Sequence, residues 1–100
     1  MTKAKPIVCT LSLSKLAARG EQWKDLVARA AQVIEHVPGG VAVRFARSDE
    51  ALAEIEELAR LERSCCEWMT LEIRRSVEAM TLLMTADSEE GVEVIRRMVQ

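Results

Sequence analysis

The chain has 100 residues, of which 49% are hydrophobic and 30% are charged, and its net charge is −2. This length and balance are typical of a single globular domain over residues 1–100, and they exclude a disordered chain. Because basic residues cluster no further than single pairs such as Arg74-Arg75, we expect neither nucleic acid nor an anionic membrane as a partner.

The N-terminal part predicts a strand followed by a long helix. From Ile7 to Leu13 apolar and polar side chains alternate, as in a half-buried strand. This stretch is too short and too polar for a signal peptide or a membrane span, so we expect a cytoplasmic protein whose three cysteines are reduced. The helix starts at the capping residue Ser14 and ends at Pro38-Gly39-Gly40. Its apolar residues recur at three- and four-residue spacings: Trp23, Leu26, Val27, Ala30, Val33, Ile34 and Val37.

The middle of the chain predicts a second strand and a second helix. Val41, Val43 and Phe45 alternate with smaller or polar residues, which indicates a strand. A helix capped by Ser48 or Asp49 follows. The apolar face of this helix carries two residues that are unusual there, Glu62 and Cys66, in line with the hydrophobic positions Leu52, Ile55, Leu58 and Ala59.

The last third predicts a β-hairpin and a final helix. Two alternating stretches, 69–74 and 80–85, are joined by a tight turn at Ser76-Val77. This turn places three apolar pairs on one face, namely Ile73 with Met80, Leu71 with Leu82 and Met69 with Met84. The final helix is capped by Asp87 or Ser88 and carries the apolar residues Val92, Ile95, Met98 and Val99.

The predicted element order is therefore β-α-β-α-β-β-α, in the α+β class. Right-handed crossovers make the first three strands parallel, and the hairpin adds an antiparallel fourth, which gives a mixed four-stranded sheet. Strong alternation in all four strands favours the strand order 1-2-3-4 with the helices mainly on one face. The same element order also fits a thioredoxin-like arrangement of three layers.

The strongest candidate site is the cysteine pair Cys65-Cys66 at the end of the second helix. Adjacent cysteines form only a strained disulfide, and as thiols they suit a soft metal or metalloid ion. Cys9 is expected at the same edge of the sheet and is the third candidate ligand, although in the order 1-2-3-4 its strand lies roughly 10 Å from the third strand. Three further side chains are candidates for positions around the ion: Glu62, Met69 and Met84. The alternative is that the cysteines are structural core residues.

Enzyme signatures are not recognised in the sequence. It contains no CxxC pair, no glycine-rich phosphate loop and no GxSxG motif. The single histidine, His36, lies off the apolar stripe and is expected at the surface. We therefore assign no catalytic residue and no obligatory cofactor, and expect a non-enzymatic protein.

Two short motifs resemble a known family. Cys9-Thr10-Leu11 and Glu62-Arg63-Ser64-Cys65-Cys66, the latter followed by an aromatic residue, resemble the C-T-L and E-R-x-C-C-P-F motifs of small, largely uncharacterised bacterial proteins of about this length. The chain departs from that pattern at Glu67 and Trp68, where the family has Pro-Phe. These proteins are loosely associated with heavy-metal resistance regions, so the resemblance implies a bacterial protein and favours a thiol site.

Two functions from different classes follow. The first is a cytoplasmic binder of a soft metal or metalloid ion that uses Cys9, Cys65 and Cys66. The alternative is a homodimeric interaction module, without enzymatic activity, whose cysteines are core residues. Self-association is expected because the second face of the predicted sheet carries small and apolar residues.

Overall fold

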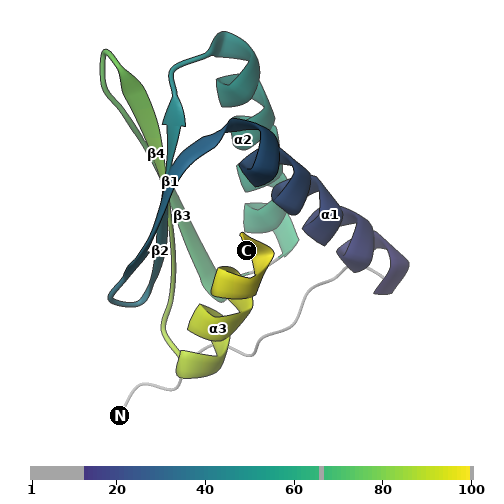
Figure 1. The fold of residues 1–100 in the computed structure, drawn as a ribbon. Coiled ribbons are helices and arrows are strands. Elements are labelled where there is room, and N and C mark those ends of the chain that lie inside the picture. Colours follow the sequence, from purple (N-terminus) through teal and green to yellow (C-terminus); the bar gives the residue numbers. More distant parts are fainter. Residues whose placement is uncertain (1–12, 66, 100) are drawn as a thin grey trace.

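A computed structural model describes residues 13–65 and 67–99, which form three helices packed on one four-stranded sheet (Figure 1). The elements, in chain order, are α1 (Leu13–Ala30), β1 (Ala31–Val37), β2 (Gly40–Ala46), α2 (Asp49–Cys65), β3 (Met69–Arg75), β4 (Ala79–Ala86) and α3 (Glu89–Met98). All neighbouring strands are antiparallel, and their order across the sheet is β1-β2-β4-β3. The helices all lie on the same face of the sheet (Figure 1). The predicted α+β class, with the helices on one face, is confirmed.

The predicted element order is wrong, because the first helix is much shorter than expected. It ends at Ala30, and residues 31–37 form strand β1, so that β1 and β2 follow one another as a hairpin. Pro38-Gly39 is the turn of this hairpin rather than the end of a helix, since Val37 pairs directly with Gly40. Gly39 has a φ of 83°, which the third position of a type II turn requires, and proline is favoured just before it.

The predicted parallel strands are also wrong. A mixed sheet in the order 1-2-3-4 required a helical crossover between each of the first three strands, whereas hairpins join β1 to β2 and β3 to β4. An antiparallel sheet with helices on one face does not match the thioredoxin-like alternative either. The strand predicted at Ile7–Leu13 lies outside the described residues, except for Leu13, which begins α1.

The predicted β3–β4 hairpin is confirmed, but its register is shifted by two residues. Ile73 pairs with Leu82 and Leu71 pairs with Met84. The turn lies one residue later than expected, because the Ser76 hydroxyl group bonds both the carbonyl oxygen and the N–H of Ala79, each at 3.1 Å. A shift of two residues keeps each side chain on its predicted face, since side chains alternate with a period of two along a strand.

The core fills the space between the helices and the sheet. Its fully buried side chains come from all three helices and from the two central strands, and include Trp23, Leu26, Ile55, Ile95, Val41, Val43, Phe45, Met80, Leu82 and Met84. The predicted apolar faces of α2 and of the β3–β4 hairpin are therefore correct. None of the described helices combines the length and the apolar content that a membrane span needs.

Candidate functional site

The predicted thiol site falls at the C-terminal end of α2, of which Cys65 is the last residue. Cys9 and Cys66 lie outside the described residues, so the convergence of three thiols stays a prediction. Among the residues that the structure describes, no three His, Cys, Asp or Glu side chains are grouped so that they could hold a metal ion. What the structure does describe is the set of contacts around the end of α2.

Glu62, one helical turn before the cysteine pair, is 3% exposed and points toward α1. Its Oε1 accepts a hydrogen bond from Arg19 Nη1 at 2.9 Å and a longer one from Trp23 Nε1 at 3.4 Å. Arg19 is itself largely buried, with 12% of its side chain exposed. A buried carboxylate needs a partner of this kind, because an unpaired charge away from water is expensive. The carboxylate that we placed near the ion is thus engaged by α1.

Arg63 anchors the same helical turn to the sheet. Its Nη2 donates a hydrogen bond of 2.8 Å to the carbonyl oxygen of Leu71, in the neighbouring strand β3. Consecutive residues of α2 therefore reach in two directions, Glu62 to α1 and Arg63 to β3. These contacts hold the backbone that carries Cys65 in place.

The connection from α2 to β3 is only three residues long, 66–68, and its far end is buried. Trp68 is 8% exposed and Met69 is 5% exposed. The indole ring of Trp68 lies against α3 at Gly91, where a Cβ atom would stand 3.2 Å from a ring carbon. Because glycine has no Cβ atom, α3 can approach the Trp68 ring this closely. The connection that contains Cys66 is therefore held at both ends.

The two methionines proposed near the ion are core residues. Met69 pairs with Ala86 across the β3–β4 hairpin and Met84 pairs with Leu71, and both lie on the face that the helices cover. Met84 is completely buried. Packing accounts for both side chains, and a contact with a bound ion stays a prediction.

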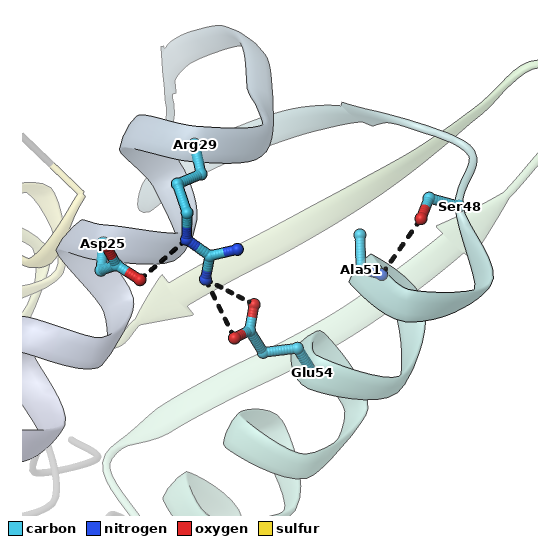
Figure 2. Close-up of polar contacts among 5 residues, drawn as sticks. All are labelled: Asp25, Arg29, Ser48, Ala51 and Glu54. Atoms are coloured by element: carbon cyan, nitrogen blue, oxygen red, sulfur yellow. Dashed lines mark hydrogen bonds and ion pairs between the residues drawn. The ribbon is translucent and has the colours of Figure 1, made fainter.

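A second contact between α1 and α2 lies at the other end of the helix pair (Figure 2). Arg29 Nη2 bonds both carboxylate oxygens of Glu54, at 2.9 and 3.0 Å, and Arg29 Nε bonds Asp25 at 2.8 Å. The hydrogen bonds that Arg29 donates to Asp25 and Glu54 raise the pKa of its guanidinium above the usual value. Of the two predicted capping residues, Ser48 caps α2, since its hydroxyl oxygen accepts a bond of 3.3 Å from the backbone N–H of Ala51.

Sequence reasoning singled out Glu62 but missed its partners. Arg19 and Trp23 are four residues apart in α1, so both side chains project from one face of the helix and can reach a single acceptor. That spacing was the available signal. No such signal exists for Arg63, because its partner is a backbone carbonyl group of another element. The single histidine, His36, is exposed as predicted but lies in β1 rather than in a helix.

Comparison with known proteins gave no match, since no protein-family model, no curated protein and no solved structure is significantly similar to the chain.

Proposed function

We propose that the protein binds a soft metal or metalloid ion through the adjacent thiols of Cys65 and Cys66, with Cys9 as a third ligand. Soft ions prefer thiolate ligands, and two neighbouring cysteines in a reducing compartment are free to supply them. In this proposal the protein acts in the bacterial cytoplasm as a binder or sensor without enzymatic activity.

The observation that supports this proposal most is the anchoring of the short connection around the cysteine pair. Glu62 bonds α1 and Arg63 bonds β3, while Trp68 is buried against α3. Anchored residues on both sides of the cysteine pair reduce the conformational entropy that is lost when an ion binds, which favours a higher affinity. A buried ion pair adds little net stability, because the cost of desolvating the charges offsets their attraction. The ion pair of Glu62 lies one helical turn before the cysteines, and this position fits a role in holding the end of α2 in place.

The chemistry of the ligands determines how binding depends on pH. Soft ions bind thiolates, whereas an ordinary cysteine thiol, with a pKa of about 8.5, is mostly protonated near neutral pH. An ion must displace these protons when it binds. The affinity is therefore expected to increase as the pH rises, with release of protons that calorimetry in two buffers measures.

The test is a titration of the reduced, full-length protein with arsenite, which binds well only where two or three thiols converge. We expect one equivalent per chain and a higher melting temperature, because an ion that binds the folded state stabilises it. Cys66→Ser should abolish both effects. Cys9→Ser should weaken binding if the site has three ligands and leave it unchanged if only the adjacent pair binds.

A second pair of variants tests the anchoring separately from the thiols. Arg63→Met removes the bond to Leu71 and keeps all three cysteines, and we expect arsenite affinity to fall about tenfold. Arg60→Met is the matched control, since Arg60 is a nearby arginine of α2 whose bonds to described residues go to Glu57 in its own helix. If arsenite neither binds stoichiometrically nor raises the melting temperature of the reduced protein, the proposed function is wrong.

A further inference from the structure

Strand β1 has an exposed outer edge that carries apolar side chains. It is a terminal strand of the described sheet, and five of its seven residues are exposed. Val33 is 53% exposed and Ile34 is 42% exposed, and they point to opposite faces, because Val33 pairs with Arg44 and Ile34 pairs with Val43. An outer strand leaves the N–H and C=O groups of every second residue without a partner in the sheet, so it can pair with another strand.

The opposite edge of the sheet, formed by β3, is protected. The guanidinium of Arg63 donates a hydrogen bond to the carbonyl oxygen of Leu71 on that strand, so this oxygen already has a partner. Glu72, Arg74 and Arg75 add charges, which oppose the approach of another strand. Strand β1 contains neither lysine, arginine nor proline, and Glu35 is its only acidic residue. Its single irregularity, a bulge between Ala31 and Val33, is confined to one end.

A shallow groove continues from this edge on the helix side of the sheet. It has a volume of about 360 Å³ and is lined mainly by apolar side chains of α1, β1 and the end of the chain, including Val27, Ala28, Ala31, Ile34 and Val99. Because Ile34 pairs with Val43, whose side chain is in the core, Ile34 projects to the same side as this groove. An apolar side chain placed next to Ile34 would enter it.

We infer that β1 is a dimerisation edge, along which a second copy of the chain adds its own β1 in antiparallel orientation to form a continuous eight-stranded sheet. A twofold axis at Ile34 suits this pairing, because Ile34 is the midpoint of Ala31–Val37 and the strands then overlap along their whole length. It places the two Ile34 side chains together beside the grooves and sets Val33 opposite Glu35. An axis at Glu35 would instead place two carboxylates opposite one another, which is unfavourable.

This edge is a different surface from the open sheet face that the sequence suggested. The open face carries an exposed ion pair, Arg74 to Glu72 at 3.3 Å, which would have to be desolvated in a face-to-face dimer. Edge pairing satisfies backbone groups and buries Val33 and Ile34 without burying that pair. One strand and one groove make a small interface, so the dimer should dissociate in the micromolar rather than the nanomolar range.

The test is sedimentation equilibrium of the full-length protein at tens of micromolar, in reducing buffer without added metal, so that neither disulfides nor ions can link two chains. We expect the wild type to sediment as a dimer and Ile34→Lys to weaken dimerisation at least about tenfold. Val77→Lys is the matched control, because Val77 is another exposed apolar residue, 88% exposed, but lies in the distant β3–β4 turn. It should sediment like the wild type.

Amide hydrogen exchange provides a second measurement on the unmodified protein. Amides of β1 should lose protection when the protein is diluted, whereas those of β4, a central strand, should not. If Ile34→Lys fails to fold, Val33→Lys takes its place, since Val33 points to the open face and not toward the groove. A monomeric wild type, or a dimer that Ile34→Lys and Val33→Lys leave intact, would overturn the inference. Because the buffer contains no ion, either result leaves the proposed thiol function untouched.

Discussion

Replacing Arg19 by methionine should destabilise the protein substantially, because it removes the charged partner of a buried carboxylate. Glu62 is 3% exposed and, of its bonds to described residues, would keep the 3.4 Å bond from Trp23 Nε1. Removing one member of a buried ion pair typically costs about 3–5 kcal/mol. Since 12% of the Arg19 side chain is exposed, water can partly replace it, and we expect a loss near the lower end, about 3 kcal/mol.

The double variant separates the ion pair from simple packing. Arg19→Met with Glu62→Leu replaces both charges by apolar side chains, an exchange that is often neutral or stabilising in buried sites. The indole N–H of Trp23 then loses its acceptor, which costs about 1–3 kcal/mol and offsets part of that gain. The double variant should therefore be more stable than Arg19→Met alone. The coupling energy between the two substitutions should exceed about 1 kcal/mol.

Urea denaturation at pH 7 measures these free energies, provided that the m-value stays constant among the variants. Arg29→Met is the matched control, because Arg29 also joins α1 to α2, through Glu54, but about half of its side chain is exposed (52%) (Figure 2). Its loss should be clearly smaller and should shrink further in high salt. A loss below about 1 kcal/mol for Arg19→Met, or simple additivity in the double variant, would refute the reasoning.

Two further predictions concern backbone space and pH. Gly20→Ala should stabilise the protein by about 0.5–1 kcal/mol, because Gly20 lies inside α1 and no atom of the described residues outside its own turn lies within 4 Å of a new Cβ. Gly40→Ala should destabilise it by at least about 1–3 kcal/mol, since the new Cβ would clash with the backbone carbonyl of Met84, and thermal melts of both variants decide the sign. The hydrogen bond from Arg60 lowers the pKa of Glu57 below its usual 4.5, so this pair contributes stability at neutral pH that is lost as the pH falls through the lowered value. The stability difference between wild type and Glu57→Gln should therefore vanish in acid, and a difference that persists below that range would contradict this assignment.

The sequence alone determined the elements whose hydrophobic period is unambiguous. Helix α2, strand β2 and, apart from its register, the β3–β4 hairpin were predicted correctly, because the helical or alternating pattern of each segment is consistent with only one structure. The buried faces followed from the same patterns, including Ile55 of α2 and Leu82 of β4. The odd position of Glu62 was also visible, since a carboxylate on an apolar face needs a partner.

Strand β1 shows where local pattern was not sufficient. Val33, Ile34 and Val37 continue the three- and four-residue spacing of Trp23 to Ala30, so the sequence fits one long helix as well as a helix followed by a strand. The β-branched side chains and the Pro-Gly turn favour the extended form only when β2 is present to pair with it. Long-range pairing thus decided the conformation of these residues and, with it, the antiparallel order of the sheet.

The candidate site divides in the same way. That Cys65 lies near the end of a helix and follows a misplaced carboxylate could be predicted from the spacing of these residues. That Glu62 bonds Arg19, that Arg63 bonds Leu71 and that Trp68 packs on α3 was decided by the tertiary structure. These contacts join segments far apart in the chain, and each depends on how helices and strands pack together, which no local period encodes.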